Sequence, residues 1–130
     1  MKKLILILCI GLLSIGLNAQ EGKPVIKFKT EVIDYGQIAK GSDGVRKFEF
    51  TNTGDAPLVI TKVYSSCGCT IPKKPEGPIA PGESSVIEVK YDTKRVGPIR
   101  KTITVTSNAT EPTKAIKIKG TILDKSVLEN

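Results

Sequence analysis

Apolar and polar residues alternate along most of the chain after residue 24, with the period of two that is typical of strands buried on one face. The alternation is clearest in Val45–Asn52, where Phe48 and Phe50 fall on one face and are predicted to point into the core. Seven segments carry the pattern: 24–29, 31–38, 45–52, 57–64, 86–91, 99–107 and 114–123. The first two also fit a single strand that is broken near Thr30. No segment beyond the N-terminal leader has the period of a helix.

Clusters of Gly, Pro, Asn and Asp separate these segments, roughly every 8–12 residues. We expect tight turns at 40–44, 52–55, 94–98 and 108–112, and an irregular loop at 72–81, which holds four prolines. Short strands joined by such turns are typical of an immunoglobulin-like (Ig-like) antiparallel β-sandwich. The pattern therefore predicts an all-β domain of seven to eight strands over residues 20–123, followed by a polar tail over 124–130.

The first 19 residues have the features of an export signal. Lys2 and Lys3 precede an apolar run over Leu4–Leu17, and small residues lead up to a predicted cut after Ala19. The run is short for a bilayer span, which favours cleavage over a permanent anchor. Cys9 lies inside the run and is not expected to be lipidated. We therefore expect a periplasmic or secreted protein that does not span the membrane after cleavage.

Composition excludes several kinds of active site. The chain has no histidine, which removes imidazole bases, Ser-His and Cys-His pairs and the usual imidazole metal sites. The chain has a net charge of +7, and Lys2 and Lys3 contribute two of these charges. Other lysines alternate with apolar residues, as they do on the solvent-exposed faces of strands. Nucleic acid is therefore not expected as a partner, and no cofactor is predicted. Four acids lie at separate turns and form no catalytic pair: Asp34, Asp55, Glu83 and Asp92.

Cys67 and Cys69 are the only cysteines after the leader, and Gly68 alone separates them. In an oxidising compartment the two thiols are expected to pair, and the loop that they close is so short that the bond would stabilise the fold little and could be readily reduced. Two thiolates could instead hold Cu(I), with no further cysteine or histidine available as a ligand. The third interpretation is a purely structural turn. Gly68 is expected to bend the backbone so that the two cysteines can meet, and Ser66 and Thr70, which flank the motif, are expected to support it.

A set of short motifs makes the chain resemble a known family. In order they are Asp34-Tyr35-Gly36, Phe50-Thr51-Asn52-Thr53-Gly54, Pro57-Leu58-Val59-Ile60, Ser66-Cys67-Gly68-Cys69-Thr70, Pro81-Gly82-Glu83-Ser84, Gly97-Pro98, Ser107-Asn108 and Ile118-Lys119-Gly120. The pattern resembles a bacterial family of exported Ig-like proteins known as domain of unknown function 1573. It is more distantly similar to the Ig-like modules of the major sperm protein and Hydin type. The resemblance implies an Ig-like sandwich and no established activity.

Taken together, the sequence predicts a non-catalytic exported Ig-like domain that acts as an interaction module of the cell envelope. Its partner is expected to be an envelope or extracellular protein, docked at an exposed sheet edge. The alternative is a periplasmic thiol-disulfide or Cu(I)-handling protein that acts through Cys67 and Cys69.

Overall fold

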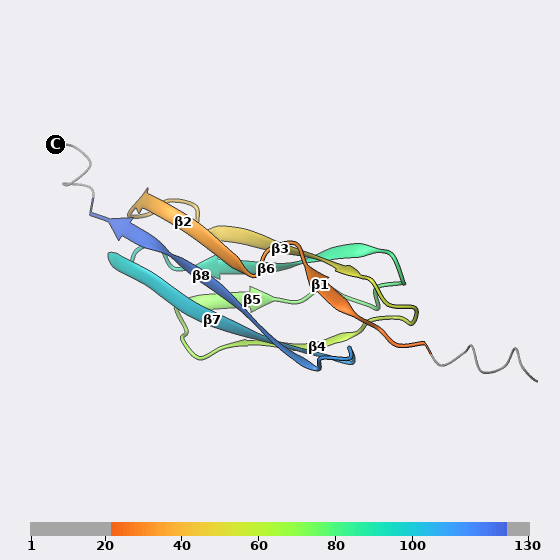
Figure 1. The fold of residues 1–130 in the computed structure, drawn as a ribbon. Coiled ribbons are helices and arrows are strands. Elements are labelled where there is room, and N and C mark those ends of the chain that lie inside the picture. Colours follow the sequence, from red (N-terminus) through yellow and green to blue (C-terminus); the bar gives the residue numbers. More distant parts are fainter. Residues whose placement is uncertain (1–21, 125–130) are drawn as a thin grey trace, which may run out of the picture.

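The computed structural model describes residues 22–124, which form two packed sheets of four strands each (Figure 1). The strands are β1 (Ile26–Phe28), β2 (Val32–Ala39), β3 (Val45–Asn52), β4 (Ile60–Ser65), β5 (Thr70–Lys73), β6 (Ser84–Tyr91), β7 (Gly97–Ser107) and β8 (Thr113–Leu123). This part of the chain holds no helix that could cross a membrane. The predicted leader, its cut after Ala19, Cys9 and tail residues 125–130 lie outside the described residues.

The strand order confirms the all-β sandwich. One sheet runs β1-β3-β6-β5 and the other β2-β8-β7-β4. Every strand pair is antiparallel except β2 with β8, which is parallel. The sandwich is therefore mostly, but not purely, antiparallel. The cause is the break near Thr30: β1 ends at Phe28 in one sheet, and β2 begins at Val32 in the other. The first strand is thereby divided between both sheets.

Two predicted boundaries were wrong. The irregular loop expected at 72–81 begins later, because Thr70–Lys73 pairs with β6 as strand β5. Pro72 is tolerated there because β5 is an edge strand. Proline has no backbone N–H, and on the open side of an edge strand there is no neighbouring carbonyl that needs this donor. The turn expected at 94–98 is also shorter, since Gly97 and Pro98 already pair with β8.

A bulge in β4 changes which side chains reach the core. Leu58 and Ile60 are buried, as the alternation predicts, but the register with β7 shifts between Ile60 and Lys62. A bulge inserts one residue and reverses the alternation beyond it. As a result Val63 packs against the core, whereas Lys62, which strict alternation from Ile60 would place on the core face, is exposed.

The inner faces of the two sheets meet in one apolar core. Phe48 and Phe50 are fully buried, as predicted, and Phe50 contacts Phe28 with ring centroids 5.7 Å apart. Isoleucines of β6, β7 and β8 complete the layer: Ile87, Ile99, Ile103, Ile116, Ile118 and Ile122. Burial of these side chains, each worth roughly 1.5–3 kcal/mol, is the main source of stability, because the described residues hold no disulfide between the sheets.

One buried polar side chain organises the end of the sandwich where β3 leaves the core. The Asn52 amide oxygen accepts hydrogen bonds from the backbone N–H groups of Val25 and Gly54. Its amide nitrogen donates to the carbonyls of Ala56 and Ile79. Three separate segments therefore converge on one fully buried asparagine.

Replacing Asn52 with alanine should leave three of these backbone groups without a protein partner, since the Ile79 carbonyl keeps its hydrogen bond from the Leu58 N–H. Since each unsatisfied buried group costs about 1–3 kcal/mol and water can reach some of them, we expect a loss of roughly 2–4 kcal/mol in the free energy of unfolding. Urea denaturation followed by circular dichroism measures this. Thr51→Ala, which removes an exposed bond to Ser84, is the control and should cost under about 0.5 kcal/mol. Equal losses in the two variants would contradict this role for Asn52.

Candidate functional site

The Cys67–Cys69 motif lies where the chain passes from one sheet to the other. β4 is an edge strand of one sheet, β5 is an edge strand of the other, and the short connection between them carries both cysteines. The two strands lie next to each other along one side of the sandwich (Figure 1). The turn is thus a crossover at the surface and not part of a sheet ladder.

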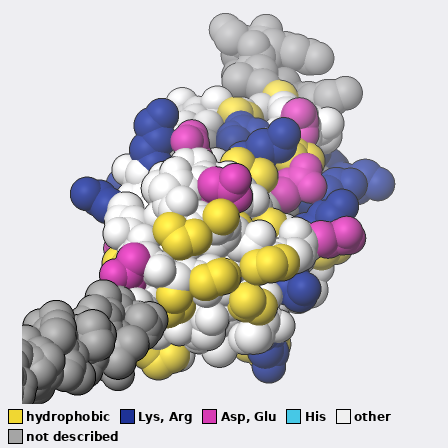
Figure 2. All heavy atoms as spheres, turned by 90° about the vertical axis from the view of Figure 1, so that its right-hand side faces the viewer, with side chains coloured by type: hydrophobic (Ala, Val, Ile, Leu, Met, Phe, Trp, Pro, Cys, Tyr) yellow, Lys and Arg dark blue, Asp and Glu magenta, His cyan; other side chains and the backbone are white. Residues whose placement is uncertain are grey.

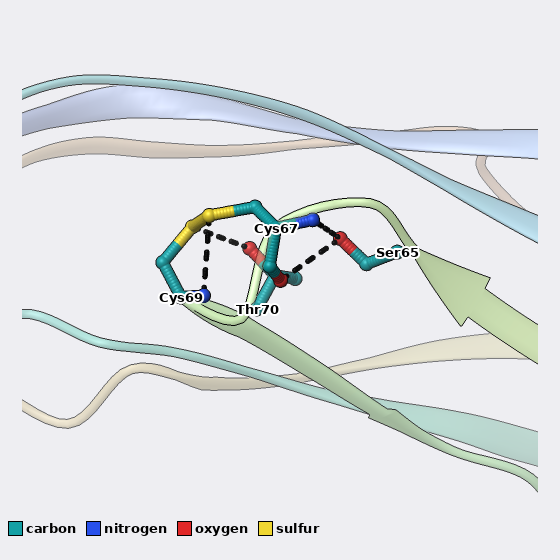
Figure 3. The surroundings of a disulfide bond; sticks show 4 residues. All are labelled: Ser65, Cys67, Cys69 and Thr70. Carbon is teal, nitrogen blue, oxygen red and sulfur yellow. Dashed lines mark hydrogen bonds between the residues drawn. A yellow bond between two sulfur atoms is a disulfide. The ribbon is translucent and has the colours of Figure 1, made fainter.

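The two cysteines form a disulfide bond, with their Cα atoms 5.2 Å apart. The backbone N–H of Cys69 lies 3.1 Å from the Cys67 sulfur and donates to it (Figure 3). The Thr70 hydroxyl is 3.4 Å from the Cys69 sulfur, so each sulfur has a hydrogen-bonding group beside it (Figure 3). Thr70 thus contacts the Cys69 sulfur, whereas Ser66 is exposed and has no such contact with either sulfur among the described interactions.

Ser65 is a supporting residue that the motif did not reveal. Its hydroxyl lies 3.4 Å from the Cys67 backbone N–H, which donates to it (Figure 3). The Thr70 N–H then bonds the Cys67 carbonyl and closes the turn. Serine side chains commonly accept a hydrogen bond from the backbone N–H two residues later in the chain. This spacing between Ser65 and Cys67 is the sequence signal that could have identified Ser65.

The two halves of the disulfide differ in exposure. Cys67 is half-buried, and Gly68 between the cysteines is exposed. Cys69 is only 6% exposed and belongs to the hydrophobic core. A reagent in solution therefore reaches Cys67 much more readily than Cys69.

Gly68 does not have the backbone conformation that would require glycine. Its φ lies outside the left-handed region, in contrast to that of Gly41 on a loop at the same end of the sandwich. A Cβ built on Gly68 would meet nothing within 4 Å. The geometry therefore does not support the expectation that glycine is needed to bend this turn. The absence of a side chain at Gly68 leaves open space beside the disulfide.

A cleft of about 420 Å³ borders the turn on the side of Cys69. Its walls come from the turn, β5, and the two loops at the same end of the sandwich: Gly41–Gly44, Gly68, Cys69, Ile71 and Lys90–Lys94. Ile71 is 62% exposed at its rim. The charged lining residues are Asp43, Lys90, Asp92 and Lys94, so the cleft has no net charge.

Hydrogen bonds tie the walls of this cleft to each other. The Asp92 N–H donates to the Cys69 carbonyl at 2.8 Å, and the Thr93 hydroxyl donates to the Ser42 carbonyl at 2.6 Å. Gly44 packs so closely that a Cβ there would collide with the Tyr91 carbonyl oxygen. The loops around the disulfide are therefore held in fixed positions.

Tyr35 lies beneath this end of the molecule. Its hydroxyl donates to the Gly44 carbonyl at 2.8 Å, and the Arg46 guanidinium stacks 4.1 Å from its ring centre. Burial raises the pKa of Tyr35 to about 12, against the lowering effect of the Arg46 charge. The phenol is thus kept protonated as a donor that anchors the loop at residue 44.

The remaining predicted site features are structural or absent. Four acids were expected at separate turns, but Asp34 lies within strand β2, where the register with β8 shifts. All four accept a backbone N–H: Asp34 from Gly36, Asp55 from Lys23, Glu83 from Ala80 and Asp92 from Lys94. Between residues 22 and 124 no group of three or more acidic, cysteine or histidine side chains could hold a metal ion. In the described structure both sulfurs are bonded to each other and not available as thiolates, so the Cu(I) interpretation gains no support.

Comparison with known families agrees with this arrangement. A family described as a protein of unknown function, DUF1573, matches residues 26–122, which include the disulfide turn and all eight strands apart from the last residue of β8. The chain belongs to the DUF1573 family. No curated protein matches the chain. The description of the family names no activity.

Solved structures support the same fold. A protein of unknown function from Porphyromonas gingivalis W83 superposes with a TM-score of 0.68 at 22% identity, over 76% of this chain and 47% of the other, so this chain spans about half of that protein's length. The ASH/PapD-like domain 7 of human CEP192 gives 0.59 at 10% identity, over 78% of this chain and 87% of that domain. The periplasmic chaperone SfaE gives 0.56 at 9% identity, over 75% of this chain and 57% of that one. At these identities the likeness shows an Ig-like fold and no more.

Removing the disulfide should cost little stability. A three-residue loop corresponds to about 1.5 kcal/mol of chain entropy, so Cys67→Ala with Cys69→Ala should lower the free energy of unfolding by about that much or less. Thermal and urea denaturation measure it. Ile103→Ala, in the core beside the crossover, should cost roughly 2–5 kcal/mol. A loss above about 3 kcal/mol in the cysteine variant would show that the bond is a structural staple.

Tyr35 should make the fold sensitive to alkali. Its phenol ionises near pH 10 when unfolded and about 12 when folded, so the unfolded state loses the proton first. The resulting stabilisation is complete below pH 10 and is lost as pH rises to about 12, a fall of roughly 2–3 kcal/mol. Urea titrations at pH 9 to 12 should show this additional fall in the parent and not in Tyr35→Phe. Parallel curves for both proteins would contradict the assignment.

Proposed function

We propose that this protein is an exported interaction module of the cell envelope that binds a protein partner through an apolar surface at one end of the sandwich. The surface is at the opposite end from the disulfide, where the described chain begins (Figure 1). We call it the apolar end and define it by five exposed residues of two loops: Pro57, Val59, Pro78, Ala80 and Pro81.

The apolar end is the observation that carries this proposal. An isolated bridge between Leu58 and Ile79, with a hydrogen bond in each direction, aligns the two loops side by side. Hydrophobic side chains gather in the middle of this face, with charged residues of both signs around them (Figure 2). Contiguous apolar surface with a polar rim is typical of a binding site, whereas scattered apolar residues need no explanation.

The loops of the apolar end are held rigidly. Asn52 bonds the carbonyls of Ala56 and Ile79, and Asn108 accepts from the Val59 N–H while it donates to the Pro57 carbonyl. A surface that is already ordered loses little conformational entropy when a partner binds. The Ser107-Asn108 motif thereby has a structural explanation as a brace for this surface.

The sheet edges are less suitable for docking than the sequence suggested. β1 has only three residues, and β2 and β4 each carry a register shift. The fourth edge, β5, contains Pro72 and Lys73. Short strands, bulges, proline and lysine are features that prevent unspecific strand pairing. For this reason we assign the partner to the apolar end.

The expected partner is a protein segment with uncharged, apolar side chains. None of the five residues of the apolar end carries a charge, and the rim contains both signs, so neither a basic nor an acidic segment is favoured. The export signal over residues 1–19 supports a location in the envelope or outside the cell. The disulfide is in keeping with an oxidising compartment.

A photo-crosslinking experiment in the producing cells tests this proposal. A photoreactive amino acid at Val59 should give a discrete protein adduct in the envelope fraction, while the same residue at Thr102, on an exposed strand face, should give none. The recovered chain should have the mass of a protein that begins at Gln20. Adding Ala80→Asp should abolish the adduct and leave the melting temperature unchanged.

Three outcomes would contradict the proposal. Equal adducts at Val59 and Thr102 would mean that contact is unspecific. Crosslinks to lipid alone would indicate that this end lies against a membrane instead of a protein. A chain found only in the cytoplasm with its leader intact would remove the envelope location.

A further inference from the structure

We propose that the Cys67–Cys69 disulfide is a thiol-disulfide exchange site, in which Cys67 is the sulfur attacked and Cys69 is the leaving group. The substrate class is a dithiol, such as two reduced cysteines of an exported polypeptide. This inference goes beyond the interaction function and does not depend on it, because the apolar end lies at the other end of the sandwich. It concerns a single turnover of the oxidised protein described here.

Exposure decides which sulfur can react. Exchange requires a thiolate to approach one sulfur of the disulfide directly. Cys67 is half-buried on the surface of the turn, whereas Cys69 is 6% exposed and packed in the core. An incoming thiolate therefore reaches Cys67 and displaces Cys69.

The surroundings of each sulfur suit these roles. The Thr70 hydroxyl, 3.4 Å from the Cys69 sulfur, can donate a hydrogen bond to the thiolate that leaves. The Cys69 N–H, 3.1 Å from the Cys67 sulfur, can do the same when Cys67 is released later. Hydrogen bonds to a charged sulfur favour the thiolate and hence its departure.

Access to the disulfide depends on Gly68. No atom lies within 4 Å of where its Cβ would be, and its φ is accessible to other residues. Steric fit and backbone conformation thus do not require glycine here. A purely structural turn would accept a larger residue at this position, whereas an exchange site needs the space for a substrate.

The rest of the turn is built to survive reduction. Three hydrogen bonds hold the turn through the backbone of the cysteines and not through the disulfide itself. The Cys67 N–H donates to the Ser65 hydroxyl, and the Cys67 carbonyl accepts from the Thr70 N–H. The Cys69 carbonyl accepts from the Asp92 N–H. The closed loop spans one intervening residue, so opening it frees little chain. We therefore expect the reduced protein to keep its fold and to present both thiols for a return reaction.

The reaction balances as two exchange steps. The first substrate thiolate forms a bond to the Cys67 sulfur, the Cys67–Cys69 bond breaks, and Cys69 leaves with the electron pair and takes up the proton of that thiol. The second substrate thiolate then attacks the substrate sulfur of the mixed disulfide and expels Cys67, which takes up the second proton. In total the substrate loses two electrons and two protons, and this protein gains both.

The first experiment assigns the two sulfurs. Protein expressed from the full sequence as Cys69→Ser or Cys67→Ser is mixed with oxidised glutathione, and mixed-disulfide formation is followed by intact mass. Cys69→Ser, which keeps Cys67, should react at least tenfold faster than Cys67→Ser, which keeps the buried Cys69. Equal rates, with both variants folded by circular dichroism, would overturn the assignment.

The second experiment tests exchange in the parent protein. A synthetic peptide with two reduced cysteines should be oxidised in equal molar amount while the protein disulfide becomes two thiols. Gly68→Val should slow this at least tenfold, and Ser66→Val, which places the same side chain at the exposed neighbour, should slow it less than threefold.

Circular dichroism and melting temperature of both variants should match the parent, so that slow exchange cannot result from unfolding. A disulfide that the peptide leaves intact, or a Gly68→Val rate equal to that of the parent, would overturn the proposal. Loss of exchange would leave the crosslinking result at Val59 unaffected, because the two tests address opposite ends of the molecule.

Discussion

Two sheets bury their inner faces against each other, and the resulting apolar layer is what holds this protein together. No tryptophan is available to fill the core, and the described part of the chain has no disulfide between the sheets. Packing is instead supplied by two phenylalanines of β3 and by isoleucines spread over the opposite sheet. Since that layer needs no covalent support, the cysteines are free to serve another purpose.

Buried polar groups close the two ends of this layer. At one end Asn52 hydrogen-bonds four backbone groups, which lie just before β1 and in the loops that follow β3 and β5. At the other end the Tyr35 hydroxyl fixes the loop at Gly44. These contacts give a physical meaning to two motifs of the sequence, Asp34-Tyr35-Gly36 and Phe50-Thr51-Asn52-Thr53-Gly54. Asparagine supplies both donors and acceptors, and the glycine at position 54 leaves room for the Lys23 carbonyl oxygen, which a Cβ would strike.

The result is a molecule with two distinct ends. One presents an ordered apolar surface made of proline-containing loops, and the other presents a small disulfide at a crossover between sheets. Because the sheets between them are packed and their edges are blocked, each end can be altered without disturbing the other. Such a separation would let one domain hold a partner and exchange a disulfide independently.

The sequence by itself determined most of the fold. Alternation at Phe48 and Phe50 identified the core face of β3, the break near Thr30 divided the first strand, and the motifs pointed to the right family. These features are local, since they depend on the period of two and on turn residues. Local pattern also singled out Cys67 and Cys69, with a disulfide as one of three interpretations, and placed Asp55, Glu83 and Asp92 between strands.

Only the tertiary structure decided the features that depend on distant neighbours. The bulge that brings Val63 and not Lys62 to the core arises from pairing with β7, and Pro72 is tolerated because β5 happens to be an edge. The unequal burial of Cys67 and Cys69 follows from the crossover between sheets, and the apolar end exists because the bridge at Leu58 and Ile79 aligns two loops far apart in sequence. Burial and surface proximity are properties of the packed sandwich, and no pattern within one segment encodes them.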